Sequence, residues 1–364
     1  MVRRRERSEI AMTTAHPRPS RPLQGPAVWR GDQLAQGSWI HHWTAPQLAE
    51  LERALATARG SGRDLASIDR HTFPLDGVAA LLANVRRELL SGRGFVLLRG
   101  IDPAAYDPID AATIFWGLGT HLGRALPQNA RGHLLGHVTD LGRDAADPGS
   151  RIYQTAERQG FHTDSADLVG LFCLQRALAG GRSSLVSCAT MHNEMLRRCP
   201  ELLAELFGPF CTDHRGEPPA GSPPYFTAPI LSWFADELSV LYQRRYIESA
   251  QRFADVPRLL EQHVAALDAF DAVAEDPDIH LEMDLEPGDM QFIHNHQMLH
   301  DRTAFRDDPA SGRRRHLLRL WLCPDEGRAL PPWFAQRLLS TVPGRRGGVA
   351  LRGVEPFVTL DPNG

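Results

Sequence analysis

Lysine is absent from this chain of 364 residues, so each of its 40 basic side chains is an arginine. Without a lysine amine, the chain cannot form Schiff bases, hold pyridoxal phosphate covalently, build a Walker-A phosphate loop or use a Ser-Lys dyad. Arginine stays protonated at neutral pH, so it binds anions but cannot act as a general base. Codon bias in a GC-rich genome is the simplest explanation for the replacement of every lysine.

Cysteine and long hydrophobic runs are also scarce. The five cysteines form no CxxC pair and are odd in number, which argues against a disulfide framework or a zinc knuckle and favours a reducing cytoplasm. The apolar runs, such as residues 168–174, are too short to cross a membrane, and no signal-peptide core follows the basic start. A net charge of −4 gives no reason to expect nucleic acid as a partner.

The composition along the chain predicts one folded domain with a tail at each end. Residues 1–25 combine Arg, Ser and Pro without a hydrophobic pattern, which is typical of a disordered basic tail. No linker divides residues 26–340, so we expect a single domain there. Residues 341–364, with the glycine-rich stretch 344–348, are expected to form a C-terminal tail. A nucleic-acid role for the arginine-rich start is the weaker alternative.

Hydrophobic periodicity predicts helices in the first third of the chain and strands after it. The helices are expected at 45–59, 77–90 and 108–122, with a buried strand at 95–100. Short apolar runs then predict strands at 168–174, 184–187, 238–242, 290–293 and 316–322, interrupted by helices at 189–207 and 256–274. Many short strands with a few helices favour a mainly β sandwich or barrel over an alternating βαβ fold.

One short segment has the pattern of a metal site. In Gly160–Asp164, His162 and Asp164 are two residues apart, so on an extended chain they project to the same side. One imidazole and one carboxylate are two thirds of the 2-His-1-carboxylate triad that holds non-haem Fe(II). Alone, this pair is weak evidence, because a buried histidine is more often a core residue than a ligand.

A second polar segment lies farther along the chain. Residues 288–300 contain a turn, a strand and three histidines, and residues 313–322 follow with four arginines. If 315–322 is a strand, Arg315 and Arg319 share a face and both faces are largely apolar, which indicates a strand covered on both sides. Buried guanidinium groups need anionic partners, and a dicarboxylate ligand would supply them. The alternatives are a solvated loop end at 313–315 and a buried aspartate paired with Arg319.

Taken in order, these motifs resemble the Fe(II)/2-oxoglutarate dioxygenases of the taurine dioxygenase (TauD/TfdA-like) family. The resemblance covers about residues 75–325 and is carried by Gly94–Gly100, His162–Asp164, Gly180–Ser183, Gly288–Asp289, His300, Arg315 and Arg319. It implies a mainly β fold with helical insertions, namely a double-stranded β-helix (jelly roll) of the clavaminate synthase-like type.

The resemblance also implies which residues hold iron. His162, Asp164 and His300 match the three iron ligands of the family. His296 is a rival for the third position, because residues 296 and 300 are separated by an even number and spacing alone cannot distinguish them. The intact carboxylate ligand disfavours a halogenase, since related halogenases have a small residue there.

Further residues match the co-substrate and substrate positions of the family. Arg315 matches the arginine that binds the distal carboxylate of 2-oxoglutarate, and Ser183 matches a hydroxyl on the same carboxylate. Arg319 matches a second arginine, which reaches either the co-substrate or an anionic group of the substrate. Gln128 and Asn129 are candidate pocket residues, although an ordinary loop pair is the commoner case.

The activity implied by the resemblance couples oxidative decarboxylation of 2-oxoglutarate by O2, with Fe(II) as cofactor, to oxidation of a C–H bond. Hydroxylation of a small organic or natural-product substrate is the expected outcome, and desaturation, epoxidation or ring formation use the same ligands. The alternative is a jelly roll that binds a metal or ligand without turnover. Relatives often form dimers or tetramers, which leaves a homo-oligomer open.

Overall fold

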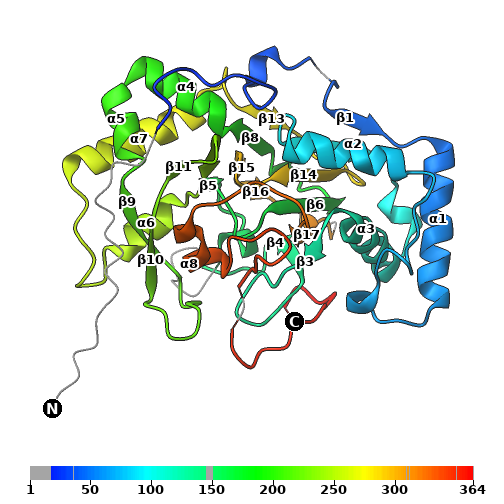
Figure 1. The fold of residues 1–364 in the computed structure, drawn as a ribbon. Coiled ribbons are helices and arrows are strands. Elements are labelled where there is room, and N and C mark those ends of the chain that lie inside the picture. Colours follow the sequence, from blue (N-terminus) through cyan, green and yellow to red (C-terminus); the bar gives the residue numbers. More distant parts are fainter. Residues whose placement is uncertain are drawn as a thin grey trace.

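The computed structural model describes residues 18–35, 37–144, 151–308, 310, 312–349 and 351–363. Its centre is a pair of β-sheets, one of seven strands and one of four, with three two-stranded ribbons at the periphery of the described region. Helices cover the outer faces of both sheets (Figure 1). The architecture agrees with the predicted mainly β fold with helical insertions.

The seven-stranded sheet has the order β1-β2-β14-β6-β17-β3, and β4 also pairs with β17. Its strands are β1 (Ile40–His42), β2 (Phe95–Arg99), β3 (Arg124–Ala125), β4 (Leu135–Thr139), β6 (Leu168–Gln175), β14 (Met290–His294) and β17 (His316–Cys323). Residues 317–323 of β17 are all buried. The prediction that this strand is covered on both faces is therefore correct.

The four-stranded sheet has the order β13-β8-β15-β5. These strands are β5 (Gln159–His162), β8 (Ser183–Ser187), β13 (Leu281–Met283) and β15 (Met298–Arg302). The antiparallel register pairs His300 of β15 with His162 of β5. The small ribbons are β7 (Ala179–Gly180) with β16 (Phe305–Arg306), β9 (Pro209–Asp213) with β10 (Tyr225–Pro229), and β11 (Leu231–Phe234) with β12 (Glu237–Val240).

Three hydrophobic cores hold these layers together. Apolar side chains of α1 (Ala45–Gly60), α2 (Ala79–Leu90) and α3 (Pro108–Leu122) pack on the outer face of the seven-stranded sheet. Side chains from both sheets, among them Leu185 and Trp321, form the central core. The outer face of the four-stranded sheet packs against α4 (Cys188–Arg198), α5 (Pro200–Glu205) and α7 (Glu261–Ala274).

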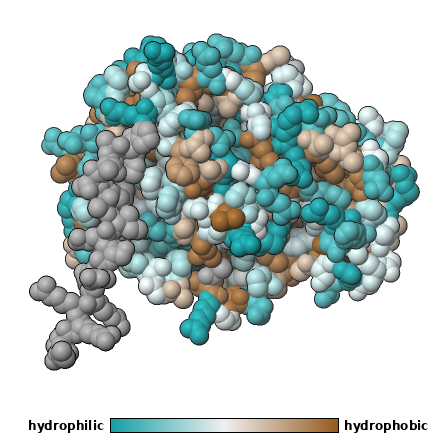
Figure 2. Space-filling view, in the orientation of Figure 1, coloured by the Kyte–Doolittle hydropathy of each residue, from teal (hydrophilic) through white to brown (hydrophobic). Residues whose placement is uncertain are grey.

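The remaining helices are short. They are α6 (Arg244–Ala250) and α8 (Ala335–Leu338), with 3-10 turns at Gly31–Gln33, Leu65–Ser67, Pro103–Ala105, Ile152–Gln154 and Pro332–Phe334. The surface of the molecule combines hydrophobic and hydrophilic residues. On the face seen in Figure 2, hydrophobic residues occur in small groups separated by hydrophilic ones. Among the described residues, no helix has the length and apolar character that a membrane span requires.

Two predicted helices differ from those observed, and a proline lies at the point of difference in each. The helix expected at 189–207 is divided into α4 and α5, because Pro200 starts the second helix and the residue before it, Cys199, is not helical (φ −155°, ψ 69°). The helix expected at 256–274 begins only at Glu261. Pro257 disfavours a helical conformation at residue 256, and the chain reaches α7 through four residues without regular structure.

The two segments expected to be tails can be described only in part. Residues 1–17 lie outside the described residues. Residues 18–25 approach α4, where the main chain of Leu23 exchanges two hydrogen bonds with the Asn193 side chain. In the expected C-terminal tail, Arg346 is 1% exposed, which is not the loose structure expected for residues 344–348, and Val349 joins the central core.

Candidate active site

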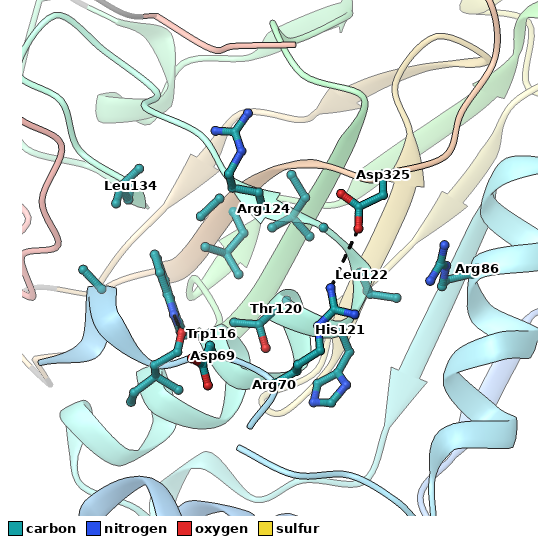
Figure 3. A pocket seen from close by; sticks show the side chains of 17 residues that line it. Asp69, Arg70, Arg86, Trp116, Thr120, His121, Leu122, Arg124, Leu134 and Asp325 are labelled. Atoms are coloured by element: carbon teal, nitrogen blue, oxygen red, sulfur yellow. Dashed lines mark hydrogen bonds and ion pairs between the residues drawn. The ribbon is translucent and has the colours of Figure 1, made fainter. Parts of the chain in front are cut away.

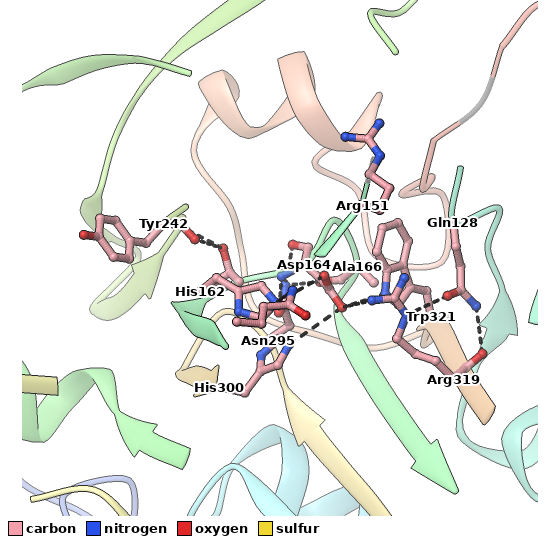
Figure 4. Close-up of polar contacts among 12 residues, drawn as sticks. Gln128, Arg151, His162, Asp164, Ala166, Tyr242, Asn295, His300, Arg319 and Trp321 are labelled. Carbon is pink, nitrogen blue, oxygen red and sulfur yellow. Dashed lines mark hydrogen bonds and ion pairs between the residues drawn. The ribbon is translucent and has the colours of Figure 1, made fainter. Parts of the chain in front are cut away.

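Three potential metal ligands converge where the edge strand of the four-stranded sheet ends (Figure 4). His162 is the last residue of β5, Asp164 follows in the next loop, and His300 lies on the neighbouring strand β15. Because β5 and β15 align His162 with His300, their imidazole rings have centroids 4.1 Å apart. One ligand atom from each of the three residues lies within 4.8 Å of the others, so a single ion can contact all three.

Both histidines are held in the neutral form that binds metals. The Nδ1 of His162 donates to the carbonyl oxygen of Gly160 at 2.9 Å, which leaves the lone pair on Nε2. Burial lowers the pKa of His162, and burial together with His162 lowers the pKa of His300 to about 3. The Nε2 atoms of His162 and His300 face opposite oxygens of Asp164, each at 3.8 Å.

Asp164 remains a carboxylate in spite of its burial. Burial alone would raise its pKa, but the positive charge of Arg319 and a hydrogen bond from Trp321 lower the pKa to about 2. Both of these donors reach Oδ2, with Trp321 Nε1 at 2.8 Å and Arg319 Nη1 at 3.3 Å. The site thus combines two neutral imidazoles with one carboxylate, which is the donor set that suits non-haem Fe(II).

Asn295 fixes the main chain on both sides of Asp164. Its Oδ1 accepts from the amide of Asp164 at 2.8 Å, and its Nδ2 donates to the carbonyl oxygens of Asp164 and Ala166 at 2.7 and 2.9 Å. Thr163 is bound in turn to the main chain of Tyr242. Sequence reasoning gave Asn295 no role in the site, although it lies among the three histidines of residues 288–300.

The rival ligand, His296, lies elsewhere. It is 1% exposed, and its Nε2 contacts Oδ1 of Asp167 at 3.0 Å. Asp167 is also paired with Arg346 in the same buried group. The structure therefore brings His162, Asp164 and His300 together and leaves His296 out of the cluster.

A small cavity next to the histidines contains the predicted co-substrate residues. Arg315 and Ser183, each 3% exposed, line this cavity together with His162 and His300. Arg315 Nη2 donates to the carbonyl oxygen of Gly181 at 3.3 Å, whereas its Nη1 is buried without a hydrogen-bond partner in the described chain. Burial lowers the pKa of Arg315 to about 10. An anionic ligand would satisfy this orphaned donor, so the cavity fits a carboxylate.

The glycine pair before Ser183 makes room for Arg315. Gly181 has a φ of +74°, and a Cβ at this position would lie 2.7 Å from Nε of Arg315. A larger residue would therefore be strained and would displace the guanidinium group. The close approach of Arg315 therefore explains why the second residue of the predicted Gly-Gly motif is a glycine.

A second buried arginine, Arg302, lines the same cavity and was missed from the sequence. It donates to the main-chain carbonyl oxygens of Thr155 and Glu157. Burial, together with the charge of Arg315, lowers its pKa to about 9. The carboxylate of Asp301, which also lines the cavity, is paired with Arg158 at 2.9 Å. Arg302 lies two residues after His300, so strand alternation would have placed both on one face.

Arg319 and Gln128 form a rigid pair beside Asp164. Arg319 Nε donates to Oε1 of Gln128 at 2.8 Å, and Gln128 Nε2 returns a bond to the carbonyl oxygen of Arg319. The guanidinium of Arg319 also lies over the ring of Tyr153, 4.6 Å from its centroid. Asn129 instead closes a turn, accepting from the amides of Arg131 and His133. The substrate and co-substrate roles of these three residues, including Asn129, stay predictions.

A larger cavity of about 360 Å³ lies between α3 and β17, and it contains none of the predicted site residues (Figure 3). Arg70 and Asp325 form an ion pair at this cavity, with 3.8 Å between their charged atoms. Its lining gathers no set of potential metal ligands among the described residues. The chemistry is therefore concentrated at the smaller cavities around His162.

Comparison with known proteins identifies a family and several relatives without reference to the geometry of the site. Residues 61–321 match the family model of the taurine catabolism dioxygenases, the TauD, TfdA family. The chain is 32% identical over 318 residues to FR-33289 synthase of Streptomyces rubellomurinus, covering 85% of this chain and 93% of that protein. It is 26% identical over 326 residues to the taurine hydroxylase-like protein SAT17 of Stachybotrys chartarum, covering 86% and 83% of the two chains.

Solved structures support the fold assignment. A structure of asparagine oxygenase in complex with Fe(II), 3-hydroxyasparagine and succinate superimposes with a TM-score of 0.59. The match covers 78% of this chain and 93% of that chain at 16% sequence identity. The predicted jelly roll with helical insertions is confirmed by this likeness.

Proposed function

The chain belongs to the TauD, TfdA family of taurine catabolism dioxygenases, and on this basis we propose that it is a non-haem Fe(II)/2-oxoglutarate-dependent oxygenase. The enzyme couples oxidative decarboxylation of 2-oxoglutarate to hydroxylation of a small organic molecule. One oxygen atom of O2 enters succinate and the other enters the product, and CO2 is released. The observation that carries the proposal is the triad of His162, Asp164 and His300 beside the unsatisfied guanidinium of Arg315.

The three residues of the triad form the proposed iron site. His162, Asp164 and His300 would hold Fe(II), which when bound supplies the oxidising chemistry for decarboxylation and C–H cleavage. Oδ2 of Asp164 is occupied by the donors of Trp321 and Arg319, so Oδ1 is the oxygen left for the metal. With one atom from each residue, the triad would hold the ion and leave it accessible from the side of the cavities.

Arg315 and Ser183 would bind and orient the co-substrate. The guanidinium of Arg315 can grip a carboxylate bidentately, and the hydroxyl of Ser183 lines the same cavity. Holding the distal carboxylate there directs the 2-oxo acid end of the molecule toward His162 and His300. Arg302 adds a second positive charge at this end of the cavity.

Succinate release tests the proposal. Purified protein with Fe(II), ascorbate, 2-oxoglutarate and O2 is expected to release succinate slowly even without a prime substrate. His162→Ala should abolish this release, whereas His263→Ala, a variant of a histidine on α7 outside the site, should not change it. Succinate release that is unaffected by His162→Ala would overturn the proposal.

The same assay tests the co-substrate residue. Arg315→Ala is expected to raise the half-saturating concentration of 2-oxoglutarate roughly 10- to 100-fold, because hydrogen bonds to charged groups contribute about 1.5–3 kcal/mol. An unchanged requirement would move this role to Arg302 or Arg319, which line the same cavity.

Four broader expectations complete the proposal. The five cysteines are free thiols, which supports a reducing, cytoplasmic location. We propose a small molecule rather than a nucleic acid or a membrane as the partner, since residues of the triad line two small cavities. We also propose one catalytic domain over residues 26–340, to which part of the segment 341–364 is bound. A homo-oligomer remains an expectation.

A further inference from the structure

The turn between β14 and β15 is joined to the loop that carries Asp164. This turn comprises residues 295–297 and leads directly into β15, the strand of His300. The amide of Asn295 donates to the carbonyl oxygen of Asp167 at 2.9 Å. The Asn295 side chain adds its hydrogen bonds to the main chain of Asp164 (Figure 4). Two of the three potential metal ligands are therefore connected to this one turn.

His296 adds a contact between side chains of the same two segments. Its Nε2 lies 3.0 Å from Oδ1 of Asp167. Burial would raise the pKa of Asp167, but the hydrogen bond from His296 and the positive charge of Arg346 lower it. Asp167 is therefore a carboxylate, which only accepts hydrogen bonds, so Nε2 of His296 is the donor.

The imidazole of His296 is also fixed on its other sides. Its ring is tilted steeply against the rings of His294 and Phe334, with centroids 5.6 and 5.5 Å away. The carbonyl oxygen of His296 accepts from the amide of Val240 at 3.0 Å. Nδ1 is buried without a hydrogen-bond partner in the described chain. Among the described residues, Asp167 is therefore the hydrogen-bond partner of this ring.

The carboxylate of Asp167 is approached from two directions. His296 reaches Oδ1 from the turn before β15, and Arg346 reaches the same oxygen from the C-terminal segment. Without the histidine donor, this oxygen would be held by the arginine alone. Because Asp164 and Asp167 belong to the same loop, a shift of Asp167 toward Arg346 would also move Asp164.

His296 has no direct contact with the reacting centre. It does not belong to the group of potential metal ligands among the described residues. It also lines neither of the two small cavities beside the triad. We propose that His296 is a positioning residue, whose hydrogen bond to Asp167 sets the position of Asp164 for the metal. The inference rests on the proposed function, because that function places the metal at the same triad.

This role differs from that of an ordinary buried histidine. Loss of a group that orients metal ligands lowers metal affinity roughly 10- to 100-fold. A histidine that only fills the core contributes to the free energy of unfolding, but the folded variant would bind metal with unchanged affinity and geometry. The two roles therefore predict different results for metal binding to the folded protein.

Titration of the metal-free protein with Co(II) tests the inference without turnover. His296→Phe keeps a buried ring but removes the donor, so it is expected to weaken Co(II) binding roughly 10- to 100-fold. The visible absorption spectrum of bound Co(II) depends on the arrangement of its ligands, and at saturation it should differ from that of the wild type. Urea unfolding of the same variant shows that the protein being titrated is folded.

A conservative variant separates the hydrogen bond from the ring. In His296→Gln, the side-chain amide can place a donor near the position of Nε2, so this variant should recover most of the Co(II) affinity. His192→Phe is the matched control, because His192 is also fully buried but lies on α4. It should bind Co(II) as the wild type does.

Two results would overturn the inference. One is a His296→Phe variant with the affinity and spectrum of the wild type, and the other is a His296→Gln variant that binds as weakly as His296→Phe. If His296→Phe fails to fold, His296→Asn replaces it, because its amide is one carbon shorter than that of Gln. Equal Co(II) affinities of the two amide variants would then overturn the inference.

The proposed function can fail separately from this inference. If the wild type releases succinate and His296→Phe binds Co(II) normally, the proposed function is retained and the positioning role is lost. If His296→Phe weakens Co(II) binding but the wild type never releases succinate, the positioning role is retained and the proposed function is lost.

Discussion

At the scale of single residues, Asp164 shows how neighbouring groups divide the work of one carboxylate. Trp321 and Arg319 both donate to Oδ2. Oδ1 therefore keeps its lone pairs for a cation, while the hydrogen bonds to Oδ2 fix the orientation of the carboxylate. Asn295 fixes the main chain of the same residue. The ligand is thus positioned before a metal binds.

The contribution of Asn295 can be measured directly. Asn295→Ala removes three hydrogen bonds around Asp164 and is expected to weaken Co(II) binding roughly 10- to 100-fold, as loss of groups that orient ligands does. Asn193→Ala is the matched control, because Asn193 also binds the main chain of a distant segment but lies on α4. Titration of both variants with Co(II) checks this, and equal affinities would contradict the role.

Residue types and spacing predict the metal ligands better than they predict the residues that surround those ligands in the folded protein. His162 and Asp164 are two residues apart in one short segment, so strand geometry alone links them. The choice of His300 over His296 depends on the register between β5 and β15, which spacing does not contain. Asn295 is 131 residues from Asp164, and no local pattern connects them. Contacts of that range arise only when the fold is complete.

At the scale of elements, a histidine pair joins β4 to β17. His137 Nε2 donates to the carbonyl oxygen of Thr359 at 2.9 Å, so its Nδ1 accepts the hydrogen bond from Nε2 of His316 at 2.8 Å. Burial and the neighbouring His137 lower the pKa of His316 to about 4. Both rings are therefore neutral in the folded protein at neutral pH.

This pair predicts a loss of stability in acid. Between pH 6.5 and about 4, the unfolded chain binds a proton at His316 that the folded protein does not, so the free energy of unfolding falls as the pH falls. One such histidine contributes about 1.4 kcal/mol per pH unit in this window. In urea unfolding at several pH values, His316→Gln should have a flatter dependence by this amount. His42→Gln, in an exposed histidine, should match the wild type, and identical slopes in all three would refute the prediction.

Periodicity predicts the long elements well and their interruptions less well. The helix at 108–122 is found with the predicted bounds, because Asp107 caps its first turn and Gly123 follows its last residue. The helix at 189–207 looks continuous by periodicity, yet Pro200 divides it. Strand order is a further limit, since β14 lies between β2 and β6 although it follows them in the chain by more than 100 residues.

At the scale of the whole molecule, the C-terminal segment is tied to the loop that follows the metal ligands. Arg346 is 1% exposed and forms an ion pair with the buried Asp167, three residues after Asp164. Its guanidinium also donates to the carbonyl oxygens of Arg328 and Thr341. The nearby Val349 lines a cavity that His162 and Asp164 also line.

Removal of Arg346 is expected to destabilise the protein strongly. Arg346→Met leaves Asp167 buried without its cation, and breaking such a pair costs about 3–5 kcal/mol. The double variant Arg346→Met, Asp167→Asn removes both charges and should recover part of that loss. Urea unfolding of the two variants checks this, and a loss below about 1 kcal/mol in the single variant would show that the pair is not important for stability.

The Asp167–Arg346 pair also sets an order of events during protein synthesis. Its members are 179 residues apart, so at about 5–20 residues per second the ribosome reaches Arg346 roughly 9 to 36 s after Asp167. During that interval the carboxylate of Asp167 lacks the arginine with which it is paired in the folded protein. We expect a nascent chain to acquire iron only after Arg346 has been made, so that metal loading is a late step in the enzyme's biosynthesis.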